Sequence, residues 1–342
     1  MSEKVLVTGG AGYVGSHTAQ KLLDSGYHVT VLDNLSTGFV EAIPVGADFV
    51  KGDIRDPIIV AKVMSEKSIT SVVHLAAKPI VAESVEKPYE YYEDNVVGSL
   101  VLLKCCKKNN IDKFVFSSTG AVYGDANPEG PMTESSLTVP LNPYGSSKLM
   151  VEKILKDADH AYGLRSVILR YFNAAGGAVN GLNGQRTKEP THLVKLAAQA
   201  ALGLRPQLSI YGTDYATSDG TCVRDYIHVE DLADVHVAAL RHLYQGGKSD
   251  LMNCGYGQGY SVREIASIMK KVSGKDFPVI CEKRRAGDAR SLVADASYLQ
   301  TRYGWKPKQN NIELICKTAY DWEKNLASLS VVVHKEAASG RH

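Results

Sequence analysis

The chain has 342 residues, of which 44% are hydrophobic and 22% are charged, and its formal net charge is +2. At about 150 residues per domain, this length predicts roughly two domains. The composition is that of a globular protein, which excludes a disordered or low-complexity chain. The small net charge excludes a bulk field that would attract nucleic acid or an anionic membrane, so we expect neither as a partner.

Cysteine and histidine patterns argue against a disulfide framework and against a metal site. The 6 cysteines form no Cys-x-x-Cys pair, and the 10 histidines include no His-Glu-x-x-His motif. We therefore expect reduced, buried thiols and no metal. No stretch approaches the ~20 apolar residues that a membrane-spanning helix needs. The opening residues show no charged leader followed by an apolar run, so we expect a cytoplasmic protein.

The first part of the chain alternates short apolar runs with longer helical patterns. Strands separated by helices of about ten or more residues are typical of βαβ units with a parallel sheet. The sequence therefore predicts an α/β, Rossmann-type doubly wound parallel sheet in a first domain, residues 1–175. We expect strands at 4–8, 27–33, 50–53, 71–75, 113–117 and 165–170, and helices at 13–25, 57–66, 86–108 and 143–162.

The pattern changes after Asn173. Residues 174–190 are rich in Gly, Asn and Ala, and a loop of this length within a compact domain is usually a binding loop. We expect residues 176–327 to form a smaller mixed α/β region that binds the substrate, with the chain crossing back to the sheet, and residues 328–342 to form a disordered tail. In the substrate region we expect helices at 191–203, 229–244 and 261–273, and a strand at 207–211.

A glycine-rich turn follows the first expected strand, with Gly9, Gly12 and Gly15 at regular spacing. Glycines at this spacing permit a tight turn and a close approach of the backbone to a pyrophosphate. The helix that follows points its N-terminal amides at such an anion. A glycine pattern alone is a weak signal. The strand before it, the helix after it and an acid at the end of the second strand together predict a dinucleotide site.

That acid is Asp33. A carboxylate at this position accepts hydrogen bonds from a ribose 2′-hydroxyl and repels a 2′-phosphate. No arginine follows in residues 34–38, so we expect NAD rather than NADP and name residues 1–175 the NAD-binding domain. Asp53 and Ile54 end the third expected strand, where an adenine edge would lie. Leu75, Ala76 and Ala77 end the fourth with small side chains, as a closely passing dinucleotide requires.

Tyr144 and Lys148 lie at the start of the helix expected at 143–162, and their spacing places both side chains on one face. A free tyrosine has a pKa of about 10, so a base that works near pH 7 needs roughly 4 kcal/mol of stabilisation of its phenolate. A nearby ammonium group and a cationic nicotinamide ring can together supply this. Tyr-x-x-x-Lys is common by chance, but after a dinucleotide turn it indicates a catalytic pair.

Hydroxyl side chains follow the strand expected at 113–117. Ser117, Ser118 and Thr119 lie at its carboxyl end, the edge at which ligands bind in open α/β sheets. We expect one of these hydroxyls to hold a substrate hydroxyl and to relay its proton.

Together these motifs resemble the extended short-chain dehydrogenase/reductase family, and within it the UDP-glucose 4-epimerases. The resemblance covers nearly the whole chain, from Val5 to about Trp322. The segments in the substrate half are much more specific than the glycine turn. The segments that carry the resemblance are TGGAGYVGSH (8–17), LDNLSTG (32–38), GDIRD (52–56), FSSTGAVYGD (116–125), NPYGSSKLMVE (142–152), RYFNAAG (170–176), DGTCVRDYIHVEDLAD (219–234) and RRAGDARSLVADAS (284–297).

The resemblance implies an NAD-dependent isomerase that interconverts UDP-glucose and UDP-galactose. The tightly bound cofactor would transiently oxidise the sugar at C4, and the 4-keto sugar would turn its other face before the hydride returns. Tyr144 would be the base, Lys148 would bind the nicotinamide ribose and tune Tyr144, and Thr119 would hold the substrate hydroxyl. The resemblance also implies a homodimer, formed through the helices near 90–108 and 145–162.

The resemblance further implies which residues hold the two ligands. Two arginines suit a diphosphate, because guanidinium groups pair with phosphate oxygens in a bidentate way. The implied UDP-hexose contacts are Thr119, Asn173, His192, Leu193, Tyr211, Arg224, Arg285, Asp288 and Leu292. The implied NAD contacts are Gly9, Gly12, Tyr13, Val14, Gly15, Asp33, Asn34, Ser36, Thr37, Gly38, Asp53, Ile54, Leu75, Ala76, Ala77, Asn95, Ser117, Tyr144, Lys148 and Phe172.

Three positions depart from the pattern of the family. Thr119 stands where members often carry serine, and the hydroxyl is kept, so we expect activity. Asp94-Asn95 replaces a common Asn-Asn, which leaves the contact of Asp94 with the cofactor open. Leu292 replaces a tyrosine of some relatives, and the smaller side chain would leave room for an N-acetyl group. UDP-N-acetylhexosamines are therefore a candidate second substrate.

Three other functions fit these residues less well. A nucleotide-sugar 4,6-dehydratase would carry Asp-Glu directly after the threonine, where this chain has Gly120-Ala121. A UDP-pentose or UDP-glucuronate 4-epimerase would share the chemistry and differ only in the sugar pocket. A non-catalytic NAD-sensing regulator would not need Tyr144, Lys148 and the hydroxyl of Thr119 together.

Overall fold

The computed structural model describes residues 3–125, 130–187 and 189–339, with side chains in the last helix described as far as Ser328. Its main sheet has seven parallel strands in the order β3-β2-β1-β4-β5-β6-β10. The order reverses between β1 and β4, and such switch points are where doubly wound sheets bind ligands. The predicted fold class is confirmed. The strands are β1 (Lys4–Thr8), β2 (His28–Asp33), β3 (Asp48–Lys51), β4 (Ser71–His74), β5 (Lys113–Thr119), β6 (Arg165–Tyr171) and β10 (Asp250–Cys254).

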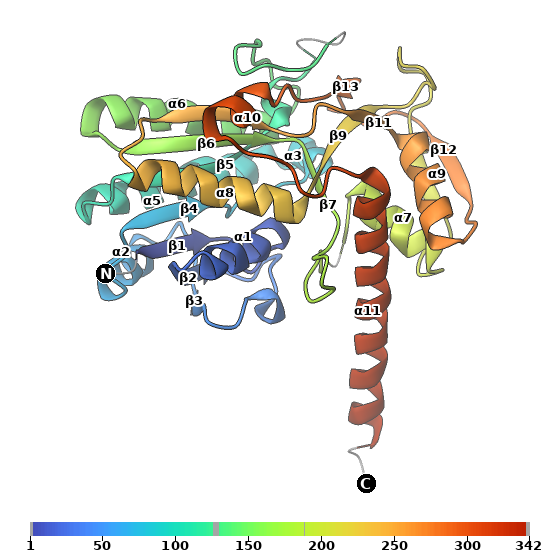
Figure 1. Ribbon diagram of the computed structural model, residues 1–342, viewed down its shortest axis with the longest axis horizontal. Coiled ribbons are helices and arrows are strands. Elements are labelled where there is room, and N and C mark those ends of the chain that lie inside the picture. The colour runs from blue at the N-terminus through green and yellow to red at the C-terminus, as the bar shows by residue number, and fades with distance from the viewer. Residues whose placement is uncertain (1–2, 126–129, 188, 340–342) are drawn as a thin grey trace.

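Helices cover both faces of this sheet (Figure 1). Val5 and Val7 of β1 belong to one core, shared with Leu232 of a covering helix, whereas Leu6 belongs to the opposite core with Leu102. Burial on both faces explains why these strands read as continuous apolar runs. The first face carries α1 (Tyr13–Asp24) and α8 (Val229–Tyr244), and the second carries α2 (Pro57–Glu66), α5 (Gly98–Lys108) and α6 (Pro143–Tyr162).

The chain leaves the sheet after β6 and later returns to it. Helix α8 packs against α1, and β10 pairs in parallel with β6, with Asp250 opposite Val167. The sheet that carries the cofactor turn is thus completed by residues far beyond position 175.

The helix expected at 86–108 is wrong in its detail. The chain forms α3 (Val81–Glu86), then starts a new helix, α4 (Pro88–Tyr92), which passes through a π-helical turn, η2 (Glu93–Val97), into α5. Pro88 begins α4 because proline lacks an amide hydrogen and fits the first turn of a helix.

The second, smaller part of the chain is built around β9 (Val223–His228). This strand pairs with three short neighbours, and a separate two-stranded sheet is formed by β8 and β12. Helices α7, α9 and α11 enclose a third apolar core. These elements are β7 (Asn173–Ala175), α7 (Leu193–Ala201), β8 (Leu208–Tyr211), β11 (Gly259–Ser261), α9 (Val262–Ser273), β12 (Val279–Glu282), β13 (Ser291–Leu292), α10 (Ser297–Tyr303) and α11 (Ile312–Ser339).

Helix α11 extends away from the body of the molecule (Figure 1). It crosses residue 328, where the sequence analysis places the start of a disordered tail, and runs to Ser339. No glycine or proline interrupts residues 313–339, so nothing in this stretch ends the helix.

Candidate active site

A cavity of about 680 Å³ lies along the carboxyl ends of the sheet strands and is closed by the substrate region. Most residues proposed from the sequence line it, from both the cofactor set and the substrate set. Three proposed cofactor residues, Gly38, Asn95 and Ser117, lie behind its wall. The proposed residues that line it are Gly9, Gly12, Tyr13, Val14, Gly15, Asp33, Asn34, Ser36, Thr37, Asp53, Ile54, Leu75, Ala76, Ala77, Thr119, Tyr144, Lys148, Phe172, Asn173, His192, Leu193, Tyr211, Arg224, Arg285, Asp288 and Leu292.

The glycine turn has the shape that a pyrophosphate requires. Gly9 has a φ of +73°, and a Cβ atom there would lie 2.6 Å from the amide nitrogen of Ala76. A Cβ atom on Gly15 would collide with the carbonyl oxygen of Gly9. Gly12 caps α1 without any side-chain hydrogen bond, so the first amides of the helix face the cavity free of a side-chain cap. The turn therefore fits the phosphates of a dinucleotide.

Asp33 is held next to this turn by backbone amides. Its carboxylate accepts hydrogen bonds from the amides of Ala11, at 3.0 Å, and Leu35, at 2.8 Å. Burial raises the pKa of Asp33, and these two hydrogen bonds oppose the rise. Gly38 packs behind the carboxylate, where a Cβ atom would lie 3.0 Å from Asp33 Oδ1. Gly38 thus permits close packing of the turn and does not line the cavity.

An ion network lies at the edge of the cavity where the adenine is expected. Arg55 forms ion pairs with Asp53, at 2.8 Å, and with Asp94, at 2.5 Å. Lys78 lies 3.5 Å from the other oxygen of Asp94. Hydrogen bonding from Arg55 holds the pKa of Asp53 well below its usual range. Asp94, which departs from the family pattern, is thus occupied by two cations of the cavity wall.

Asn95 does not line the cavity but forms hydrogen bonds next to it. Its side chain accepts a hydrogen bond from the amide of Lys78, at 2.8 Å, and donates one to the hydroxyl of Ser147, at 3.0 Å. Asn95 therefore joins the loop after β4 to α6, the helix that carries Tyr144 and Lys148.

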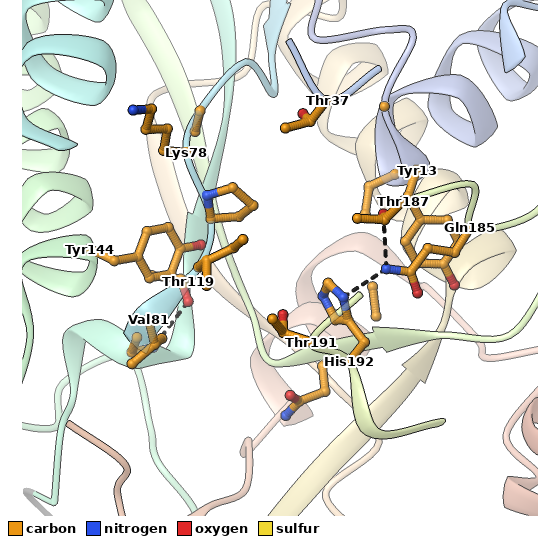
Figure 2. A pocket seen from close by; sticks show the side chains of 18 of the residues that line it. Tyr13, Thr37, Lys78, Val81, Thr119, Tyr144, Gln185, Thr187, Thr191 and His192 are labelled. Carbon is orange, nitrogen blue, oxygen red and sulfur yellow. Dashed lines mark hydrogen bonds between the residues drawn. The ribbon is translucent and has the colours of Figure 1, made fainter. Parts of the chain in front are cut away.

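Tyr144 lies in the first turn of α6, whose start is fixed by local chemistry. Pro143 occupies the first helical position, and Asn142 Oδ1 accepts a hydrogen bond from the amide of Gly145 at 2.9 Å. Figure 2 shows the Tyr144 hydroxyl pointing toward Thr119. Thr119 Oγ1 also accepts a hydrogen bond from the amide of Ala121 at 3.1 Å. The two hydroxyls can therefore meet one substrate hydroxyl together.

The three candidate hydroxyls have different surroundings. The Ser117 hydroxyl is 2.8 Å from Nε2 of His236, and the Ser118 hydroxyl donates to Glu152. Neither serine lines the cavity, whereas Thr119 does. Thr119 is therefore the one of the three that a substrate can reach.

Lys148 lies one helical turn beyond Tyr144 and is buried. Its ammonium group donates a hydrogen bond to the carbonyl oxygen of Ser117 at 2.8 Å. Burial lowers the pKa of Lys148 to about 7, although the charge of Glu152 opposes this. Burial also raises the pKa of Tyr144, against hydrogen bonding to Thr119. The groups of the chain alone therefore do not provide the lowered pKa that a tyrosine base requires.

Cations in the substrate half face the same cavity. Arg224 of β9 donates to the carbonyl oxygen of Val223 at 2.9 Å and, within the described residues, has no carboxylate partner at ion-pair distance. Arg285 forms an ion pair with Asp288 at 3.0 Å, and its guanidinium group lies 4.6 Å from the ring centre of Tyr211. This arrangement suits a diphosphate.

The loop between β7 and α7 forms the opposite side of the cavity (Figure 2). The side chain of Gln185 lies 2.7 Å from Nδ1 of His192 and donates to Thr187 at 3.2 Å. Burial lowers the pKa of His192, so its ring is neutral near pH 7. Asn173 donates a hydrogen bond to the carbonyl oxygen of Asp225 at 3.3 Å.

Several lining residues were not selected from the sequence. Lys78 and Arg55 each follow a sheet strand closely, and a cation at a carboxyl edge is a signal that could have identified them. Gln185 and Thr187 lie in the expected binding loop, but composition does not tell which of its residues face the cavity. Cys222 lines the cavity beside Arg224.

The part of the chain that the structure describes lacks both a membrane-spanning helix and a cluster of metal ligands. None of its helices is long and apolar enough to cross a membrane. Within the same residues, no group of three or more His, Cys, Asp or Glu side chains is placed to hold a metal ion.

Comparisons with known proteins agree with this geometry. The pattern of the NAD dependent epimerase/dehydratase family matches residues 5–255. A UDP-glucose 4-epimerase of Azospirillum brasilense is 52% identical over 95% of this chain and 93% of that protein. The crystal structure of the Bifidobacterium longum UDP-glucose 4-epimerase, with NAD+ and UDP, has a TM-score of 0.90 and 39% identity, covering 94% of this chain and 98% of the other.

A third relative is the UDP-Glc/GlcNAc 4-epimerase of Campylobacter jejuni. Its structure has a TM-score of 0.82 and 44% identity, covering 95% of this chain and 100% of the other. With the uncapped turn, the Tyr144–Lys148 pair and the unpaired arginine in one cavity, these matches lead to one conclusion. This chain belongs to the NAD dependent epimerase/dehydratase family.

Proposed function

We propose that this chain interconverts UDP-glucose and UDP-galactose with a tightly bound NAD. One observation carries the proposal: Tyr144, Lys148 and Thr119 face the same cavity as the uncapped start of α1 and the cation of Arg224. The names of the relatives support the same reaction.

Bound NAD would accept and return the hydrogen at C4 of the sugar, and its ring would bring a positive charge to this end of the cavity. Tyr144 takes the proton of the C4 hydroxyl, which Thr119 holds, and gives it back on the other face. Lys148 stabilises the phenolate of Tyr144. The hydrogen bond to the Ser117 carbonyl holds the Lys148 ammonium group in position. With a pKa of about 7, Lys148 keeps a substantial charged fraction at neutral pH.

Recognition of the substrate is stronger at its nucleotide end. Arg224 and Arg285 provide charged donors for the diphosphate, whereas Leu292 and Phe172 offer apolar surfaces to the sugar. A sugar that is held loosely can turn about its phosphate linkage while the nucleotide stays bound.

The alternative of a 4,6-dehydratase is disfavoured by space as well as by sequence. A Cβ atom on Gly120 would lie 2.8 Å from the ring of Phe172, so an acidic side chain at this position would require the ring to move. Without an acid directly after Thr119, the chain has no group there to move protons at C5 and C6 of the sugar.

The test uses the protein as isolated, without added NAD. A catalytic amount is expected to convert UDP-galactose into UDP-glucose, as followed by chromatography of the sugar nucleotides. A Tyr144→Phe variant is expected to lose about 10²–10⁴-fold in kcat, the usual contribution of a general base. Tyr162→Phe, an exposed tyrosine at the end of the same helix, is the matched control. Turnover of Tyr144→Phe at the wild-type rate would overturn the assignment, and a non-catalytic NAD sensor would show no turnover at all.

The range of sugars is tested with a panel of UDP-glucose, UDP-GlcNAc, UDP-xylose and UDP-glucuronate. Leu292 lines the cavity, and we propose that it leaves room for an N-acetyl group. Leu292→Tyr is then expected to reject UDP-GlcNAc and to keep UDP-glucose. If wild type and Leu292→Tyr turn over UDP-GlcNAc equally well relative to UDP-glucose, Leu292 does not control the space for the N-acetyl group.

We also propose a cytoplasmic homodimer. Tyr89 of α4, Val97 of η2 and Met150 of α6 are exposed apolar side chains on the helices that the resemblance assigns to the dimer contact. These helices contact one another, and exposed apolar side chains that form one patch are typical of a protein interface.

A further inference from the structure

A buried line of polar groups lies behind the sugar end of the cavity. Its four members are Glu152, Arg170, Tyr123 and Asn253, each 5% exposed or less. They come from α6, β6, the segment after β5, and β10. None of the four lines the cavity. They therefore cannot touch a ligand there and can act only through other residues.

Hydrogen bonds join the four groups in sequence. Arg170 binds the Glu152 carboxylate through Nε, at 3.0 Å, and Nη2, at 2.5 Å. Its Nη1 donates to the Tyr123 hydroxyl at 2.9 Å. That hydroxyl in turn donates to Oδ1 of Asn253 at 2.7 Å. The Arg170 guanidinium, whose charge is balanced by Glu152, polarises the Tyr123 hydroxyl. This strengthens the hydrogen bond that the hydroxyl donates to Asn253.

The line ends at the segment that directly follows Leu292 and β13 in the chain. Asn253 donates through Nδ2 to the carbonyl oxygen of Met132 at 2.7 Å. Met132 pairs with this segment, donating to the carbonyl oxygen of Val293 at 2.7 Å and accepting from the amide of Asp295 at 2.8 Å.

Packing makes the same connection. Tyr123, Met132 and Val122 form a small apolar cluster, and Leu292 and Phe172 pack against it. Both Leu292 and Phe172 line the cavity. The side chains that face the sugar therefore rest on the side chains that the buried line holds in place.

At its other end the line reaches the catalytic helix. Glu152 lies one helical turn beyond Lys148 on α6, and it also accepts a hydrogen bond from the Ser118 hydroxyl, next to Thr119 on β5. One connected set of groups thus spans the helix of the proton-transferring residues and the wall of the sugar pocket.

We propose that Tyr123 and Asn253 are positioning residues for sugar selectivity: they fix the wall formed by Leu292 and Phe172, and so set the space beside the sugar ring. This inference rests on the proposed epimerase function and extends it. Removing the Tyr123 hydroxyl leaves Asn253 Oδ1 without its donor and Arg170 Nη1 without its acceptor, and buried unsatisfied groups are relieved by local rearrangement. The rearrangement loosens Met132 and the strand of Leu292, whereas the glycine turn and Tyr144 stay in place.

The test compares Tyr123→Phe with wild type as isolated holoenzyme. The readouts are NAD content, kcat and KM for UDP-galactose, and the inhibition constant of UDP-GlcNAc against UDP-galactose turnover. The inhibition constant is measurable whether or not UDP-GlcNAc is itself converted. In Tyr123→Phe, NAD content and kcat are expected to stay within about threefold of wild type. The ratio of the UDP-GlcNAc inhibition constant to the UDP-galactose KM is expected to fall by about fivefold to tenfold, because a looser wall admits the larger sugar.

The matched control is Tyr244→Phe. The Tyr244 hydroxyl is also hydrogen-bonded, to Ser71 at 3.0 Å and to Thr70 at 2.6 Å. These residues lie at the start of β4, where the strands have their amino-terminal ends, whereas the cavity lies along the carboxyl ends. This variant is expected to lose stability without any change in the ratio. Asn253→Asp is a second, nearly isosteric variant, which loses the donor to Met132 and is expected to shift the ratio as Tyr123→Phe does.

The outcomes of these measurements decide whether Tyr123 and Asn253 have the positioning role. A wild-type ratio in both Tyr123→Phe and Asn253→Asp would overturn the positioning role. An equal shift in Tyr244→Phe would also overturn it, because the effect would then follow stability alone. Failure of wild type to epimerise any UDP-sugar would refute the proposed function and the positioning role with it, because the ratio needs turnover of UDP-galactose. An active wild type with an unchanged ratio in the variants would refute the positioning role alone.

Discussion

Replacement of Lys148 by methionine is expected to stabilise the nucleotide-free protein while abolishing its activity. Lys148 is 4% exposed, and burial lowers its pKa from 10.5 to about 7. At about 1.36 kcal/mol per pKa unit, a charged Lys148 costs the folded state roughly 5 kcal/mol below pH 7. Methionine removes that cost, but it leaves the Ser117 carbonyl without its donor, at about 1–3 kcal/mol. The net expected gain at pH 6 is therefore about 2–4 kcal/mol.

The stability difference between Lys148→Met and wild type is expected to depend on pH. Between pH 7 and 10.5 the folded protein holds Lys148 neutral, whereas the unfolded chain still binds the proton. The stability of wild type therefore rises with pH across this window. The advantage of Lys148→Met is expected to be full below pH 7 and to shrink by about 1.4 kcal/mol per pH unit above it.

The assay is urea unfolding at pH 6 and pH 9 after removal of nucleotides, because bound NAD would stabilise wild type by mass action. Lys195→Met is the matched control. Lys195 is equally buried but paired with Glu323, so its loss is expected to destabilise by about 3–5 kcal/mol. A Lys148→Met variant that is less stable than wild type at pH 6, or a difference that does not change with pH, would refute the reasoning.

Three further predictions concern the ligands and the assembly. Arg224→Met removes a charged donor worth about 1.5–3 kcal/mol, so the KM for UDP-galactose is expected to rise at least about tenfold with unchanged NAD content; an unchanged KM would separate Arg224 from the diphosphate. Asp33→Ser removes the charge that repels a 2′-phosphate, and reconstitution with NADP is expected to improve at least about tenfold relative to NAD. The same preference for NAD over NADP in the variant as in wild type would contradict this. Val97→Glu places a charge on an exposed apolar position of η2, and light scattering is expected to report a monomer; a persisting dimer would exclude this face as the contact.

Local sequence was sufficient for those parts of the site that lie within one turn or one helix. The glycine turn, Asp33 and the Tyr144–Lys148 pair could each be recognised from residues spaced fewer than about twenty positions apart in the sequence, and the cavity brings them together. The start of α6 could be read in the same way, from Asn142 and Pro143.

Contacts between distant segments could not be read from the sequence. Tyr123 and Asn253 are 130 residues apart, and nothing near either one indicates the partner. The π-helical turn that places Asn95 against Lys78 was missed for the same reason, because the partners of Asn95 come from the loop after β4 and from α6. Pro88 is different: it was a visible break within the helix expected at 86–108.

The return of β10 to the sheet has a consequence for biosynthesis. Strand β6 is the outermost strand on its side until Asp250–Cys254 pairs with it. During translation the ribosome must therefore deliver some eighty more residues after β6 before this edge is covered, and unpaired strand edges are prone to aggregate. A fragment that ends near residue 175 would keep that edge permanently open and would also lack α8. Until β10 is made and pairs, the free edge of β6 is the place where a partly synthesised chain is most exposed to pairing with another chain.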